Sequence, residues 1–266
     1  MFTRKKTILA VSILCISSSA YADNFPKLDK ALPSGIDATT IAPIFDFDKD
    51  SCLPSAGISR GGAQNRGLKP TGGLTGGCRW STFTDMSNTL HRYACIDSAG
   101  ARYCGHFYAL YFQKDQILNK LPGIGTGHKH DWEQVAVWTR NGTVTHGSFS
   151  AHGKMTTELA SKLEKQDKHL KFVYHKDGVL THAFRFAKKN EQAENPLGKF
   201  VTPDIISWYS MVGDGISNEE LRHRLNTFDY GSASIPLKDS NFLTNLNKNR
   251  PGGYPEFTPA SVTAAR

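Results

Sequence analysis

The chain has 266 residues, of which 11% are aromatic and 21% are charged, and this composition excludes an intrinsically disordered protein. The length suits one large domain or two small ones, while 24 glycines and 12 prolines predict frequent turns and disfavour a long helical bundle. The formal net charge is +8, from 32 Lys and Arg against 24 Asp and Glu, but the basic residues form no stripe, so we expect no nucleic-acid partner.

Residues 1–22 form the first predicted element, a secretory signal peptide. Three basic residues at 4–6 precede an apolar run over 8–16, and small residues lead to a cleavage site before Asp23. The apolar run is too short to cross about 30 Å of hydrocarbon, so we expect no integral membrane span. We therefore expect a secreted protein with a single domain over residues 23–266. Its net charge is +5, because the signal removes three positive charges from +8.

An acidic segment follows, in which Asp46, Asp48 and Asp50 are spaced like the first ligands of a calcium loop. Such a loop also needs a glycine where Ser51 stands and a glutamate where Gly57 stands. The segment is therefore interpreted as a second calcium site or, alternatively, as a solvated acidic turn.

Four cysteines remain after removal of the signal, an even number that indicates disulfides in an oxidising compartment. Four cysteines allow three pairings. Cys95 and Cys104 would close a short loop between two strands, which leaves Cys52 and Cys78 to close a glycine-rich stretch. We favour this pairing over zinc binding, since no Cys-x-x-Cys pair is present.

Short aromatic and β-branched runs predict most of the regular structure. Strands are expected over 101–112 and 132–139, and Asn141-Gly142 predicts a hairpin turn after the second strand. A further hairpin is expected from residues 172–175 and 180–186. The pattern predicts a mainly β protein, an antiparallel sandwich with a few flanking helices.

Three helices are expected. Residues 155–170 carry Met155, Leu159 and Leu163 at helical spacing, which favours a solvated surface helix over a membrane-binding one. Residues 202–212 predict a buried helix that begins at Pro203. A capping-box pattern at Ser217 and Glu220 predicts a helix with its apolar face at Leu221, Leu225 and Phe228.

The strongest local signal is the heptapeptide Gly127-His128-Lys129-His130-Asp131-Trp132-Glu133, which places four potential metal ligands within six residues. Residues two apart in a strand share a face, so Asp131 and Glu133 point the same way, with His128 in the loop before them. Oxygen-rich ligation with one imidazole suits Mg²⁺, Ca²⁺ or Mn²⁺ better than zinc. The alternative is a set of exposed charges at the end of a strand.

This heptapeptide resembles the Gly-His-Arg-His-Asp-Trp-Glu motif of the necrosis- and ethylene-inducing peptide-like proteins, which are secreted cytolysins of plant-associated microbes. Residues 108–115, 174–178, 181–182 and 229–233 resemble other family segments in the family's order. The resemblance covers most of residues 40–250. It implies a β-sandwich like that of actinoporins and some fungal lectins, with a divalent cation bound by Asp115, His128, Asp131 and Glu133.

The family also implies a target, the glycosylated inositol-phosphate sphingolipids of plant plasma membranes, whose head groups are bound before the membrane is damaged. Lys129 replaces the usual arginine, so a two-point contact with an anion becomes a single-point contact. Leu110 replaces a common tryptophan, and the gap between Asp115 and His128 is long. Four cysteines and this gap are similar to the second branch of the family, which has a comparable calcium segment.

We expect the lipid head group to meet Lys129 and His130, because Lys129 shares a strand face with Asp131. His175 and His182 flank a turn and are expected at the same end of the sandwich, although each is alternatively a buried, hydrogen-bonded histidine.

Three functions remain open. The favoured one is a binding-type toxin, not an enzyme and monomeric in solution, that recognises an anionic glycolipid head and disrupts the membrane. The second is a secreted metal-dependent nuclease or phosphodiesterase, with His130 as general base. The third is a lectin-like adhesin without lytic action.

Overall fold

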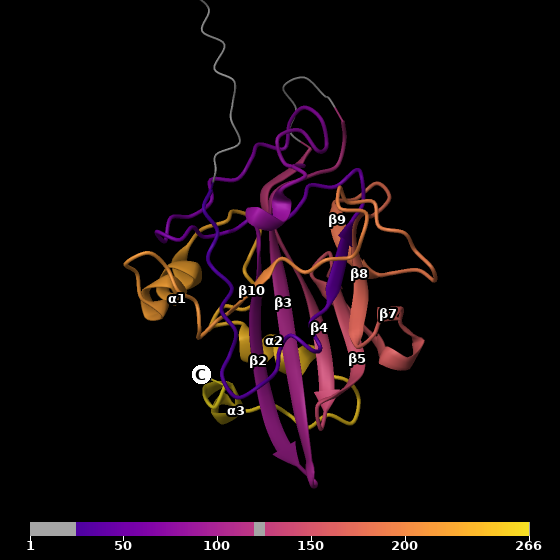
Figure 1. Cartoon of the computed structure of the whole chain (residues 1–266), viewed down its shortest axis with the longest axis vertical. Coiled ribbons are helices and arrows are strands. Elements are labelled where there is room, and N and C mark those ends of the chain that lie inside the picture. Colours follow the sequence, from indigo (N-terminus) through magenta and orange to yellow (C-terminus); the bar gives the residue numbers. More distant parts are fainter. Residues whose placement is uncertain (1–24, 120–125, 266) are drawn as a thin grey trace, which may run out of the picture.

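The computed structural model describes residues 25–119 and 126–265, so the expected signal peptide lies outside the described residues. Two β-sheets, three α-helices and two short 3-10 helices (Phe83–Asp85 and Ala160–Lys162) make up the regular structure of these residues (Figure 1). The larger sheet has six strands in the order β10 (Asp204–Ser207), β2 (Asn88–Ser98), β3 (Ala101–Gln116), β4 (Gly127–Arg140), β5 (Thr143–Ala151) and β6 (Lys154–Leu159). The smaller sheet contains β1 (Ile44–Phe47), β8 (His169–Lys176), β7 (Lys165–Gln166) and β9 (His182–Phe186).

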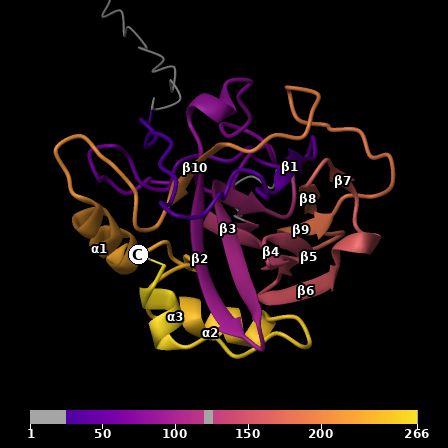
Figure 2. The same ribbon diagram turned by 60° about the horizontal axis from the view of Figure 1, so that its bottom comes forward.

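The elements stack in three layers. Figure 2 shows the larger sheet between the smaller sheet on one side and the helices on the other. These helices are α1 (Asn218–Thr227), α2 (Phe242–Asn249) and α3 (Pro259–Thr263). The predicted sandwich is therefore confirmed, but both sheets are mixed, because β1 pairs parallel to β8 and β10 pairs parallel to β2.

Strand β3 is buried on both faces, which explains why its sequence is apolar almost without interruption. Phe107, Ala109 and Tyr111 belong to the core under the helices, whereas Tyr108 and its alternate neighbours belong to the core between the sheets. A central strand that serves two cores is held rigidly. The end of β3 is therefore a firm platform for functional side chains.

Several local predictions are confirmed. Cys52 is bonded to Cys78, and Cys95 to Cys104. Asn141 and Gly142 connect β4 to β5, and β8 pairs antiparallel with β9. Helix α1 begins as expected, with the Ser217 side chain accepting a hydrogen bond from the Glu220 backbone N–H.

Two predicted helices are wrong. Residues 155–170 instead contribute to β6, to a short 3-10 helix (Ala160–Lys162), to β7 and to the start of β8. The backbone of β6 pairs with the edge of β5, and this tertiary context overrides the helical spacing of the apolar residues. The predicted helix at 202–212 is replaced by β10, whose β-branched Ile205 and Ile206 are buried beside β2. Among the described residues, no helix is long and apolar enough to cross a membrane.

Candidate metal centre and adjoining cavity

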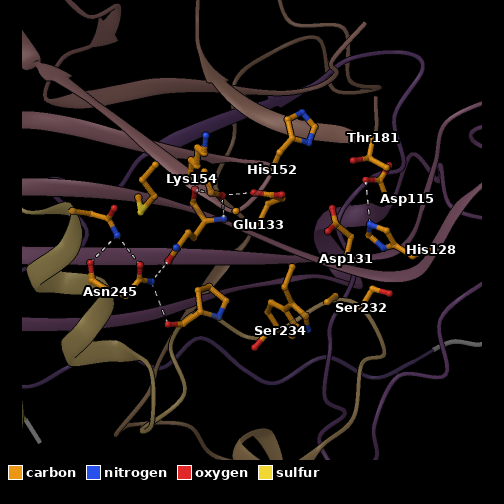
Figure 3. A pocket seen from close by; sticks show the side chains of 18 of the residues that line it. Asp115, His128, Asp131, Glu133, His152, Lys154, Thr181, Ser232, Ser234 and Asn245 are labelled. Carbon is orange, nitrogen blue, oxygen red and sulfur yellow. Dashed lines mark hydrogen bonds and ion pairs between the residues drawn. The ribbon is translucent and has the colours of Figure 1, made fainter. Parts of the chain in front are cut away.

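Three of the four predicted ligands meet where β3 ends and β4 begins. One ligand atom each from Asp115, His128 and Asp131 lie within 4.8 Å of one another, and Figure 3 shows these side chains turned toward a common point. Asp115 and His128 are register partners in the β3–β4 ladder. His128 therefore belongs to the strand β4, whereas the sequence predicts that it lies in a loop before the strand.

The backbone of β4 is irregular at this point. His130 has a φ of 62°, a left-handed conformation that interrupts the alternation of side chains along the strand. His128 consequently lies with Asp131, three residues further on. Gly127 has a φ of 115°, and a Cβ there would collide with the Asp115 carbonyl oxygen, so glycine is required where the strands converge.

The orientation of His128 suits a metal ligand. Its Nδ1 donates to the His130 carbonyl oxygen at 2.6 Å, which leaves the Nε2 lone pair free, 3.8 Å from Asp115 Oδ2. A histidine ligand is commonly fixed in this way, by a hydrogen bond from its other ring nitrogen.

The two carboxylates are held by partners outside the heptapeptide. The backbone N–H of His182 lies 3.0 Å from both Asp115 oxygens, and the His182 Nδ1 donates to Oδ1 at 2.7 Å. The Tyr174 hydroxyl donates to Asp131 Oδ2 at 2.8 Å. Both partners come from the smaller sheet, so contact between the sheets sets the ligand positions.

The electrostatics of this cluster favour a bound cation. Burial, reinforced by the negative charge of Asp115, raises the pKa of Asp131 to about 8. Burial and the nearby Asp131 also raise the pKa of Glu133 well above its usual range, although the Ser150 hydroxyl donates to it. Carboxylates packed so closely require a proton or a cation between them. Two carboxylates and one oriented imidazole therefore fit a hard divalent cation.

A cavity of about 330 Å³ adjoins the cluster. Asp115, His128 and Asp131 lie at one end, while Lys154 and Asn245 lie away from them in Figure 3. Glu133 lines the cavity between these ends but is outside the three-residue cluster. The remaining walls mix polar residues, which include Ser150, Ser232 and Ser234, with apolar ones such as Trp132 and Met155.

The residues expected to meet a lipid head group lie mostly elsewhere. Lys129 is exposed and does not line the cavity, because the irregular backbone at His130 removes it from the face of Asp131. His130 is 6% exposed and bonded through Nδ1 to the Tyr111 hydroxyl at 2.6 Å. His182 is buried behind Asp115, and the Nδ1 of half-buried His175 donates to the Lys176 carbonyl at 3.0 Å. His175 and His182 thus match the alternative of a hydrogen-bonded histidine, and His130 is hydrogen-bonded as well instead of being an exposed charge.

Among the described residues, Asp46, Asp48 and Asp50 do not gather into a group of potential metal ligands. Asp46 is buried, and its carboxylate accepts hydrogen bonds from the backbone N–H groups of residues 194 and 195. Asp48 is paired with Arg185 at 3.6 Å. The described residues contain only one group of three potential ligands close enough for a metal, the cluster around Asp131.

Sequence reasoning missed Tyr174 and Ser150 as partners of the carboxylates, and Lys154, Asn245 and Lys248 as walls of the cavity. The family-like segments contained a usable signal, because Tyr174, Thr181 and Ser232 belong to them and all lie at or beside the cavity. No local pattern marks the contribution of α2, which only the tertiary structure brings to the site.

Comparison with known proteins connects this site to a family. The family model described as necrosis inducing protein (NPP1) matches residues 37–249. NLP effector protein 2 of Phytophthora capsici is 29% identical over 213 residues, which cover 76% of this chain and 74% of that protein. NLP effector protein 3 of Plasmopara viticola is 30% identical over 206 residues, or 75% of this chain and 81% of that protein. The solved structure of NLPPya in complex with mannosamine has a TM-score of 0.66 at 25% identity, and the match covers 85% of this chain and 95% of NLPPya.

Proposed function

The chain belongs to the necrosis-inducing protein family, and on this premise we propose that it is a secreted toxin that binds glycosylated inositol-phosphate sphingolipids of plant plasma membranes and then disrupts the membrane. The proposal extends the family's necrosis-inducing activity to a particular class of target. It assigns head-group recognition to the cavity beside Asp115, His128 and Asp131.

The observation that carries the proposal is the convergence of these three ligands at the end of a polar cavity. We propose that they hold a divalent cation, Mg²⁺, Ca²⁺ or Mn²⁺. A cation there would supply positive charge and open positions for hydroxyl oxygens of a sugar. Glu133, whose carboxyl group accepts a hydrogen bond from the Ser150 hydroxyl, would contribute a further polar contact from the cavity wall.

The polar cavity walls support recognition of a sugar. Ser232 and Ser234, both on the lining of the cavity, offer hydroxyl groups. A related protein, NLPPya, has been solved in complex with mannosamine and with glucosamine. We infer that this chain likewise takes a hexose-like ring next to the cation.

We propose binding, and not bond cleavage, as the activity. A hydrolase would need His130 as general base, but its ring is engaged by Tyr111 and packs beside Tyr230. Desolvation by burial, reinforced by the charge of Lys129, lowers the pKa of His130 to about 4. An imidazole held this way neither faces the cavity nor takes up protons near neutral pH.

The test is dye release from vesicles of phosphatidylcholine that contain plant glycosylated inositol phosphoceramide. We expect release with Mg²⁺ or Mn²⁺ and none with chelator, while mass spectrometry finds the lipid intact. Vesicles without the glycolipid should not leak. A hydrolysed lipid product would favour the phosphodiesterase hypothesis, and glycolipid binding without leakage would favour the adhesin.

A further inference from the structure

We propose that a second cavity, formed largely by the segment between β1 and β2, binds a fatty acid anion, whose alkyl chain covers apolar walls while its carboxylate meets the guanidinium of Arg66. The cavity has a volume of about 600 Å³, within the range of roughly 300–1,000 Å³ that is usual for small-molecule sites. Among the described residues, it shares no lining residue with the cavity beside the candidate metal centre. The inference therefore goes beyond the proposed function and gives the chain a further ligand.

The cavity belongs to one long connection of the chain. Figure 1 shows this connection, residues 48–87 in purple, crossing the upper end of the molecule, away from α2 and α3. Two bonds tie its walls together: the disulfide between Cys52 and Cys78, and a hydrogen bond from the Leu53 N–H to the Cys78 carbonyl oxygen at 2.8 Å. The cavity is therefore bounded by a cross-linked part of the fold.

Apolar residues supply most of the lining. Leu53 and Phe83 are buried and close the floor, while Leu68 and Met86 are half-buried in the walls. Trp80 lies at the rim with 41% of its surface exposed, and its indole N–H is bonded to a backbone oxygen of its own loop at 3.3 Å. Single exposed apolar residues are common on protein surfaces, but here apolar side chains gather around one hollow, which an alkyl chain would fill.

The charge of the cavity favours an anionic head group. Among the described residues that line it, Arg66 is the only one that carries a charge, and the other polar ones are neutral: Ser55, Gln64, Asn65 and Gln113. Within residues 25–119 and 126–265, Arg66 takes part in no ion pair, whereas Arg60 is paired with Asp214 at 2.8 Å. An unpaired guanidinium beside an apolar hollow is complementary to a carboxylate on an alkyl chain, because it can bind both carboxylate oxygens at once.

The loop that carries Arg66 is already ordered. Asn65 is 3% exposed, and its side chain accepts a hydrogen bond from the Gly67 N–H at 2.9 Å. The Leu68 N–H donates to the Gln113 carbonyl oxygen at 2.7 Å, which ties the loop to β3. The backbone on both sides of Arg66 is thus fixed, so binding of a ligand requires no ordering of the loop, which favours affinity.

The test is isothermal titration of the full chain in the presence of chelator, with decanoate, neutral decanol and short-chain butyrate as probes. We expect decanoate to bind, decanol to bind about ten-fold more weakly because it lacks a charged head, and butyrate at least about 100-fold more weakly because it lacks apolar surface. Arg66→Gln should reduce decanoate affinity about ten-fold and leave decanol affinity unchanged. Trp80→Ala should weaken decanoate and decanol alike, by about five-fold.

The matched control is Lys69→Gln, which removes an exposed positive charge close to Arg66 in the sequence and outside the cavity lining. Thermal melting checks that each variant is folded. No binding of decanoate, equal affinities for decanoate and decanol, no loss in Arg66→Gln, or the same loss in Lys69→Gln would overturn the site.

The site is independent of the cation and of the proposed function. Decanoate should bind Asp131→Ala as tightly as it binds wild type, because Asp131 does not line this cavity. A loss of decanoate binding in that variant would place the fatty acid at the metal centre and overturn the assignment to Arg66. Vesicle leakage, in contrast, tests the proposed function alone.

Discussion

Two acidic clusters of this molecule look alike in sequence and differ in structure. Asp46, Asp48 and Asp50 alternate in the way expected of cation ligands, as do Asp131 and Glu133. In the first cluster, the carboxylate of Asp46 is bound by N–H groups of a distant loop, and Asp48 faces Arg185. In the second cluster, the buried carboxylates face one another and a cavity.

The difference shows that the spacing of acidic residues in the sequence does not by itself produce a cation site. Whether acidic side chains can take up a cation depends on whether the rest of the fold already supplies hydrogen-bond donors for the carboxylates. Asp46 also accepts a bond from the Asn195 side chain at 2.6 Å, and therefore works as an anchor for the loop that precedes β10. Asp131 accepts hydrogen bonds from the Tyr174 hydroxyl and the Trp132 backbone, yet burial and the charge of Asp115 still raise its pKa. A bound cation would relieve this unfavourable burial of charge.

The largest expected effect separates the clusters by function. Asp131→Ala should lower Mn²⁺ affinity by at least about 100-fold, because even outer partners of metal ligands contribute about 10–100-fold. Leakage of glycolipid vesicles should disappear. The fold should survive, since removal of one carboxylate relieves repulsion in the metal-free protein. Isothermal titration with Mn²⁺, leakage and thermal melting measure the three quantities, and normal leakage by this variant would contradict the metal site.

The next effect concerns stability at the other cluster. Asp46→Ala should lower the free energy of unfolding by about 3 kcal/mol, because it strands buried N–H groups that now bond to a charged acceptor. Mn²⁺ affinity should stay at the wild-type value. Asp50→Ala is the control, because its carboxylate accepts no hydrogen bond from the described residues. Denaturant titration measures the change, and a loss of Mn²⁺ affinity in Asp46→Ala would make the two clusters one site.

A third effect appears in the pH dependence of the metal-free protein. The folded-state pKa of Asp131 is raised to about 8, from an ordinary value of 3.8. The folded protein therefore holds a proton that the unfolded chain releases, and stability is lost as the pH rises from about 4 toward 8. The slope for one proton is at most about 1.4 kcal/mol per pH unit. Thermal melting in the presence of chelator should show this decline in stability. Mg²⁺ should suppress the decline, and Asp131→Asn should flatten it. A stability that rises over this pH range would contradict the raised pKa of Asp131.

The smallest effect is expected at Lys129. Because its side chain is exposed and does not line the cavity, Lys129→Ala should change leakage of glycolipid vesicles less than about two-fold. Dye release by the variant and by wild type gives the comparison. A ten-fold loss in Lys129→Ala would return this lysine to the binding site.

Local chemistry accounts for what the sequence predicted well. Alternation and turn residues identified β3, β4 and their hairpins, and the heptapeptide contributed two of the three potential metal ligands that the structure brings together, His128 and Asp131. The prediction that Lys129 and Asp131 share a strand face is wrong, because His130 between them has a left-handed backbone conformation that interrupts the alternation of side chains. The residue type of His130 does not predict this conformation. The predicted helix at 155–170 is wrong because the edge of β5 offers backbone hydrogen-bond partners to β6, and the helical spacing of apolar residues does not reveal them. The sequence could not show that Lys154 and Lys248 line the cavity, because α2 is brought to the cavity only by tertiary packing.

Asp115 and His128 stand opposite each other in the β3–β4 ladder, so hydrogen bonds between the strands set their separation. The Ile117 N–H closes the ladder with a bond to the Thr126 carbonyl at 2.9 Å. Because these backbone bonds set the spacing, substitutions of neighbouring side chains that keep the two strands paired leave the distance between the two ligands unchanged.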